Sequence, residues 1–169
     1  MHKGWLAAAT ATTLSMASLT NAANPKVTTT FAVTATVQPN CTTSATALGF
    51  GTYTPGNGAL AANSTITVNC TKSTAYTIAL NPGTTTGDSF TQRLLASGAN
   101  LLQYNLYTTA AFATVWGDGT GKTATQTGTG AGKATASTFR VYGQLPDSAA
   151  NQTAVPGTYT DTITVTVTY

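Results

Sequence analysis

The stretch Tyr159-Thr-Asp-Thr-Ile-Thr-Val-Thr-Val-Thr-Tyr169 places a threonine at every even position. Alternation with a period of two is typical of a β-strand that buries one face, and threonine, valine and isoleucine suit a pleated surface. Pro156-Gly157 predicts a turn just before it. We therefore expect a terminal strand with no strand after it, whose apolar face is made by Tyr159, Ile163, Val165, Val167 and Tyr169.

A second alternating segment lies near the front of the chain, from Val27 to Val37. The apolar residues at its odd positions form one face, and Pro39 ends it. At about eleven residues it is longer than the usual strand of about five or six. We expect residues 23–33 to be an extension and residues 34–169 to be the domain, with the end of this segment forming the first strand before Cys41.

The chain between these two segments predicts further short strands separated by turns. One part, residues 119–136, is rich in glycine and threonine and predicts a loop or a loose edge. About seven strands at roughly ten-residue spacing, with no helical pattern, predict an all-β immunoglobulin-like sandwich. The expected strands are Leu48–Tyr53, Ser64–Cys70, Thr74–Leu80, Gln92–Leu95, Leu101–Tyr107 and Thr138–Gly143.

The first residues have the pattern of an export signal. His2 and Lys3 precede an apolar run over residues 5–19, and small residues end at Ala22. The run is too short and too rich in threonine to span a bilayer well. We expect residues 1–22 to be a signal peptide.

Composition supports an all-β protein and argues against nucleic-acid binding. Threonine takes 40 of the 169 positions, and charged residues make up only 7 %. The few lysines and arginines are scattered, so no basic stripe suggests a nucleic acid as partner.

Cys41 and Cys70 are the two cysteines of the chain. In an exported protein such a pair favours one disulfide, which would close a loop of roughly 30 residues and contribute about 3 kcal/mol or somewhat more. A metal pair or free thiols are the alternatives. A metal site needs further ligands, and the single histidine, His2, lies in the predicted signal peptide.

No constellation of residues predicts catalysis. The aspartates are isolated from one another in sequence, and no histidine outside the signal peptide is available as a base for a serine nucleophile. We expect no enzymatic activity and no cofactor. Four aromatic residues suit either a sugar-stacking surface or the core, and base rates favour the core: Tyr104, Tyr107, Trp116 and Tyr142.

An ordered series of motifs resembles the spore coat protein U domain, which also forms the subunits of archaic, Csu-type chaperone–usher pili. The resemblance covers nearly the whole chain after residue 22. It rests on Leu102-Gln-Tyr-Asn-Leu-Tyr107, Val115-Trp-Gly-Asp-Gly119, Val141-Tyr-Gly143 and Gly157-Thr-Tyr-Thr-Asp161.

The resemblance implies an incomplete sandwich that lacks its last strand and receives a donor strand from a chaperone or a neighbouring subunit. The implied partners are a periplasmic chaperone, an outer-membrane usher and neighbouring pilin subunits. The implied location is an extracellular fimbrium that supports surface attachment and biofilm formation. Cys41 and Cys70 match the family's disulfide, and Ile163, Val165, Val167 and Tyr169 match its terminal strand.

The residues themselves indicate which segment would be the donor. An extended alternating segment can complete a backbone ladder and fill core pockets, and strand addition of this kind is known from pilins. We expect the donor to be Val27, Thr29, Phe31 and Val33, and the acceptor groove and chaperone edge to be Ile163, Val165, Val167 and Tyr169. A carbohydrate-binding adhesin and a secreted, non-fibrous coat protein are the alternatives.

Overall fold

The computed structural model describes residues 24–169, so the predicted signal peptide lies outside the described residues. No helix in the described part is long and apolar enough to cross a membrane. A single short 3-10 helix, Asn151–Thr153, accompanies the strands there. The strands are β1 (Cys41–Ala45), β2 (Leu60–Cys70), β3 (Ala75–Leu80), β4 (Arg93–Ser97), β5 (Asn100–Tyr107), β6 (Gln126–Thr129), β7 (Ser137–Leu145) and β8 (Val165–Thr168).

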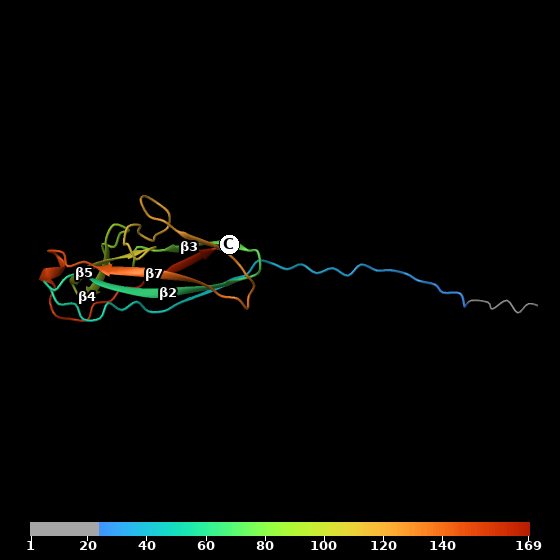
Figure 1. The fold of residues 1–169 in the computed structure, drawn as a ribbon, viewed down its shortest axis with the longest axis horizontal. Coiled ribbons are helices and arrows are strands. Elements are labelled where there is room, and N and C mark those ends of the chain that lie inside the picture. Colours follow the sequence, from blue (N-terminus) through green and yellow to red (C-terminus); the bar gives the residue numbers. More distant parts are fainter. Residues whose placement is uncertain (1–23) are drawn as a thin grey trace, which may run out of the picture. The chain divides into compact units, whose positions relative to one another are not determined.

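These strands form two antiparallel sheets, as predicted for an all-β sandwich. The larger sheet has the order β1-β2-β7-β5-β4, and the smaller has the order β6-β3-β8. The longest pairing joins β2 to β7, from Leu60 opposite Leu145 to Val68 opposite Ser137, and it can be followed in Figure 1.

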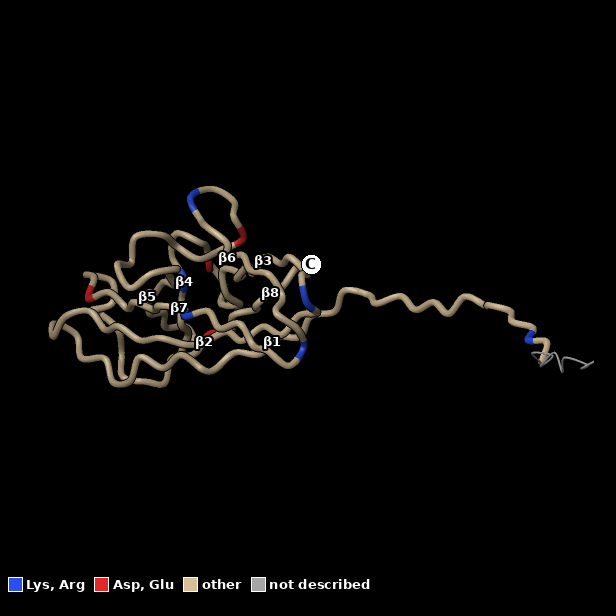
Figure 2. The backbone as a smooth tube through the Cα atoms, turned by 45° about the vertical axis from the view of Figure 1, so that its right-hand side comes forward, with Lys and Arg blue, Asp and Glu red and all other residues tan. Residues whose placement is uncertain are grey.

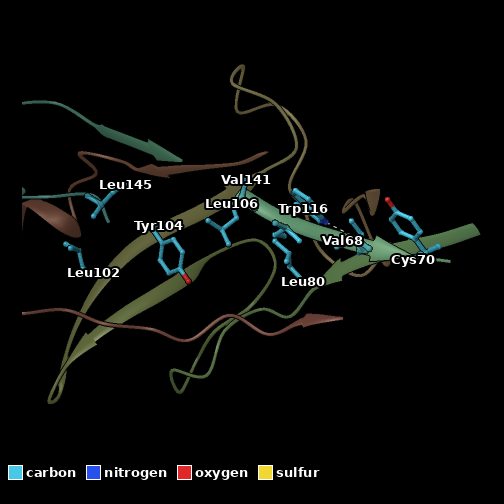
Figure 3. Close-up of a cluster of buried hydrophobic side chains, with 12 residues drawn as sticks. Val68, Cys70, Leu80, Leu102, Tyr104, Leu106, Trp116, Val141 and Leu145 are labelled. Carbon is cyan, nitrogen blue, oxygen red and sulfur yellow. Dashed lines mark hydrogen bonds between the residues drawn. The ribbon is translucent and has the colours of Figure 1, made fainter. Parts of the chain in front are cut away.

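The core lies between the sheets because their strands alternate as the sequence predicted. In β2, Ile66, Val68 and Cys70 are buried, whereas the residues between them are less so. β3 contributes Ile78 and Leu80 from the other sheet to the same cluster. In Figure 3 the labelled core side chains extend from Leu102 and Leu145 at one end to Cys70 at the other.

The chain divides into two parts, residues 1–36 and 37–169. The described residues of the first part, 24–36, form no strand, and the side chains of Val27, Phe31 and Val33 are 96 %, 86 % and 84 % exposed.

The expected first strand over residues 34–37 is wrong, because β1 begins only at Cys41. Val37 is 83 % exposed. Alternation predicts which residues can share a face, but a strand forms only where a neighbouring strand is available for pairing.

Two other expectations also need correction. Residues 48–53 form no strand, although Leu48 and Phe50, which share one parity, pack against the core, as does Tyr53. Residues 119–136, expected to be a loop or a loose edge, contain β6, which pairs with β3 as an outer strand of the smaller sheet. There Gly128 lies opposite Tyr76, and a Cβ at residue 128 would collide with the tyrosine ring. A glycine in this strand therefore reflects a close approach rather than a loop.

Candidate functional site

An apolar groove of about 320 Å³ runs beside the terminal strand. One wall is formed by residues 45–50, from the end of β1 onward, and the other by residues 161–165, up to the start of β8. The floor is the core itself, contributed by both sheets: Ile66, Leu80, Leu106 and Val141.

The groove continues into a second hollow of about 580 Å³. Residues 48–53 extend the first wall, and residues 154–159 extend the second. The two hollows share Leu48, Phe50 and Leu95, so we treat them as one groove.

The groove is open because a strand is missing between the edges of the two sheets. β8 pairs with β3 along one edge, and no strand within residues 24–169 pairs with its other edge. β1 is likewise the outer strand of its sheet in the described part of the chain. The core between these edges is left accessible from outside.

The predicted acceptor residues occupy different depths along this wall. Ile163 and Val165 line the groove, and Val167 packs against the core opposite Ile78 of β3. All three are half-buried, whereas the residues between them are exposed. Tyr169 lies beyond the end of β8 and is 56 % exposed, so the core-facing position expected for it is not observed.

Asp161 interrupts the apolar face of this wall and is held by a hydrogen-bond network. Its Oδ2 accepts the hydroxyl of Tyr104 at 2.6 Å, and its Oδ1 accepts the N–H of Thr84 at 2.9 Å. Burial, and then the hydrogen bond to Asp161, raise the pKa of Tyr104 above its ordinary value. The network fastens the wall to the turn after β3 and to β5.

Arg93 is a fully buried cation close to the floor of the groove. Its guanidinium donates to Asn105 Oδ1 at 2.6 Å, to the carbonyl of Asn81 at 2.9 Å and to the carbonyl of Trp116 at 2.8 Å. Burial lowers its pKa. Because these acceptors follow or belong to strands of both sheets, Arg93 connects the two sheets. The sequence around Arg93 did not predict this role.

Asp88 stands near Asp161 on the same side. Its Oδ1 accepts the N–H of Leu94, and its Oδ2 accepts the N–H of Thr85, both at 2.6 Å. Burial raises the pKa of Asp88 despite these bonds, and the charge of Asp161 adds to the rise. A Cβ at residue 83 would collide with both carboxylates, so Gly83 allows them to come together.

The other wall is held by a third carboxylate, that of Asp147. Asp147 accepts hydrogen bonds from the hydroxyl of Tyr53 and from the N–H groups of Gly56 and Gly58, the latter two at 3.1 and 3.0 Å. These bonds lower the pKa of Asp147. Burial, with the bond to Asp147, raises the pKa of Tyr53 to about 12. The pair fastens the end of this wall to the residue that follows Pro146.

The predicted disulfide joins Cys41 to Cys70 and leaves no free cysteine in the described chain. It connects the first residue of β1 to the last residue of β2, which lie opposite each other. Lys133 donates to Asn40 Oδ1 at 2.8 Å beside it. The start of the domain is thus anchored where residues 24–40 meet β1.

The four aromatic residues considered for a sugar-stacking surface are separated by the fold. Trp116 and Tyr104 are buried in the core. Tyr107 and Tyr142 are half-buried and lie opposite each other on β5 and β7. Within the described part of the chain, no three histidine, cysteine, aspartate or glutamate side chains gather as metal ligands would. Figure 2 shows the charged residues spread over several parts of the domain.

The chain belongs to the Spore Coat Protein U domain family, because residues 27–166 match that domain. A search of curated proteins finds no match. Among solved structures, the chain is similar to a chain in the crystal structure of the CsuC–CsuE chaperone–tip adhesion subunit pre-assembly complex, from the archaic chaperone–usher Csu pili of Acinetobacter baumannii. The identity is 26 % and the TM-score 0.52, over 79 % of this chain and 40 % of that chain. This chain therefore spans less than half the length of its solved relative.

Proposed function

We propose that this protein is a structural subunit of an extracellular chaperone–usher fibre and polymerises by donor-strand complementation. The observation that carries the proposal is an apolar groove beside the terminal strand, open onto the core. The same chain carries an exposed alternating segment with the parity such a groove requires. An extension on one copy and a groove on the next make a head-to-tail contact, which propagates into a filament.

The donor is Val27, Thr29, Phe31 and Val33, and the acceptor edge includes Ile163, Val165, Val167 and Tyr169. An incoming strand would pair with the free edge of the terminal strand and lay its apolar side chains on the floor of the groove. Burying Val27, Phe31 and Val33 contributes about 1.5–3 kcal/mol each, or roughly 5–9 kcal/mol in total. The cost of ordering the segment offsets part of this gain.

The open groove also indicates the other partners. An exposed apolar edge aggregates unless it is covered, so a newly exported subunit needs a periplasmic chaperone before assembly. The similarity to a chain of a chaperone–subunit complex supports this step. Assembly then proceeds through an outer-membrane usher, and the fibre supports surface attachment and biofilm formation.

The substitution Phe31→Asp tests the donor role. A carboxylate entering the groove without a partner costs several kcal/mol, so we expect fibres to be lost while the chaperone complex accumulates normally. Thr30→Asp is the matched control, because residue 30 has the opposite parity and its carboxylate would face away from the groove. Subunit–chaperone complex and fibre are measured separately for each variant. Equal loss of complex and fibre in Phe31→Asp would contradict the proposal.

Deletion of residues 23–31 separates the proposal from other functions. A fibre subunit loses polymerisation and keeps its fold. A carbohydrate-binding adhesin that does not polymerise keeps its sugar binding, and a non-fibrous coat protein still forms its layer, so either result counts against the fibre role.

A further inference from the structure

Each of the two alternating segments carries one polar residue on its otherwise apolar face. Between Val27 and Val37, the odd positions are apolar except Thr29. Between Tyr159 and Tyr169, they are apolar except Asp161. A polar residue on a face that becomes buried needs a hydrogen-bond partner there.

Asp161 has room for one more donor. Its Oδ1 is used by Thr84, through N–H at 2.9 Å and Oγ1 at 3.2 Å, and by the Thr85 hydroxyl at 3.4 Å. Its Oδ2 accepts the Tyr104 hydroxyl at 2.6 Å and no other donor in the described chain. A carboxylate offers about four acceptor positions, two on each oxygen. Since Asp161 lines the groove, an incoming strand can supply the missing donor.

The hydroxyls on the opposite side of the groove are already paired. Ser64 donates to the carbonyl of Thr46, and the two hydroxyl oxygens lie 3.1 Å apart. Thr46 Oγ1 also accepts the N–H of Thr65 at 3.0 Å. Thr162 belongs to the exposed parity of its strand. Asp161 is therefore the charged side chain of the first hollow with an acceptor position left to fill.

We propose that the hydroxyl of Thr29 donates to Asp161 Oδ2 of the neighbouring subunit and so sets the register of the donor strand. The proposal rests on the proposed function and adds to it the residue pair that selects one alignment. With Thr29 beside Asp161, Val27 and Phe31 fall beside Tyr159 and Ile163 for either direction of the incoming strand, because same-face neighbours are two residues apart. A shift by two residues places an apolar side chain against the carboxylate and Thr29 against an apolar position.

A purely structural role for Asp161 makes the opposite prediction. If Asp161 serves only to fasten its own strand, Thr29 is a polar residue buried among apolar ones, and valine at this position should improve binding. If Thr29 fills the open acceptor position, valine should weaken binding. The sign of the effect distinguishes the two accounts.

The experiment uses the full-length subunit purified as its complex with the co-expressed chaperone. Synthetic peptides of residues 24–37 are added, and the fraction of subunit that exchanges the chaperone for the peptide is measured against peptide concentration. The Thr29→Val peptide should bind at least about tenfold more weakly than the wild-type peptide, as expected for a hydrogen bond to a charged group. Thr29→Ser should bind within about threefold of wild type, because it keeps the hydroxyl, and Thr28→Val should bind as wild type does.

In the variant Asp161→Asn, the penalty for Thr29→Val should shrink, because a neutral acceptor makes a weaker bond. If this variant does not fold, the comparison of the valine and serine peptides on the wild-type subunit decides the question. Binding of the Thr29→Val peptide equal to or tighter than that of the wild type overturns the register proposal and leaves the donor role intact. Failure of the wild-type peptide to exchange at all counts against the proposed function itself.

Discussion

β2 and the terminal strand have the same alternating pattern, but their apolar side chains are buried to different extents. Ile66 and Val68 of β2 are each 1 % exposed. Ile163, just before β8, and Val165 and Val167 of β8 are only half-buried. β2 lies between β1 and β7, whereas β8 pairs with β3 alone among the described strands and borders the groove. Periodicity therefore determines which residues share a face, and the number of neighbouring strands determines how deeply that face is buried.

Residues 24–36 extend this comparison to a third case. They alternate as β2 does, yet they form no strand, and Phe31 is 86 % exposed. Within the described residues, β2 pairs along both of its edges, the terminal strand pairs along one, and residues 24–36 pair along none. The burial of the apolar side chains decreases in the same order.

The largest expected effect on folding comes from comparing an aspartate placed in β2 with one placed in the segment that leads into β8. Ile66→Asp buries an unpaired carboxylate at a cost of several kcal/mol, which is comparable to the whole stability of a typical domain. We expect no folded protein. Ile163→Asp introduces its charge beside the open groove, where water can reach it, and the subunit should remain folded. Protease resistance and circular dichroism of periplasmic protein compare the two. Equal loss of folded protein would show that the terminal strand is as enclosed as β2.

Removal of the disulfide tests the edge where β1 pairs with β2. Cys41→Ser opens a link between residues 29 positions apart. It should lower the free energy of unfolding by about 2–5 kcal/mol. Urea unfolding of the variant and of Cys70→Ser measures the loss, which should be similar for both. Mass spectrometry of the unreduced wild type checks the bond itself, and two free thiols there would contradict it.

Truncation of the terminal strand should have a more selective effect. Deletion of residues 167–169 removes the residue that faces Ile78 of β3 and shortens the edge offered to a chaperone. We expect the soluble chaperone complex to be lost. Thr168→Ala is the control: residue 168 is exposed and has the opposite parity to the acceptor residues, so the chaperone complex should form as in the wild type. Normal co-purification of the truncated chain would show that the chaperone does not use this edge.

The smallest expected effect concerns the pH dependence of the wall opposite the terminal strand. Tyr53 lowers the pKa of Asp147, so the stability from this pair is present above the ordinary aspartate pKa of about 3.9 and is lost as the pH falls through the lower folded-state value. Tyr53→Phe removes the donor. The urea midpoints of variant and wild type should therefore converge as the solution is acidified. A constant difference down to acid pH would contradict the assignment.

At alkaline pH, the stability contributed by Tyr53 changes in the opposite direction: it is lost as the pH rises. Its folded-state pKa is raised to about 12. The stability contributed by its neutral form is therefore present below the ordinary tyrosine pKa of about 10 and is lost as the pH rises through 12. Tyr53→Phe should lose less stability than the wild type over this pH range, because Tyr104 and Tyr107, whose pKa values are also raised, remain in both proteins.

The sequence predicted most strands well where apolar residues alternate over several positions, as in Ser64–Cys70 and Leu101–Tyr107. It failed where a local backbone turn, or a contact distant in the chain, decides the structure. Leu48 and Phe50 alternate and face the core, but Gly51 adopts φ +76° and no strand forms. Gly128 suggested a loop because the sequence does not show the tyrosine ring that lies against it, which is contributed by another strand.

The candidate site divides in the same way. The apolar parity of the terminal strand and of residues 27–33 could be read directly from the sequence, because side-chain direction in an extended chain depends only on position. Arg93 and Asp147 could not be identified, because their roles depend on partners brought together by the fold, such as Asn105 and Tyr53.

By itself, the sequence of this protein determined the all-β class, the faces of its strands, the disulfide pair and the family resemblance, since these depend on local periodicity, on the number of cysteines or on ordered motifs. Only the tertiary structure decided where the sandwich is open. An opening is a property of two sheet edges, β1 and β8, that come from opposite ends of the domain and are left without a strand between them. No local pattern encodes that gap, because it depends on how many neighbours each strand acquires when the chain folds.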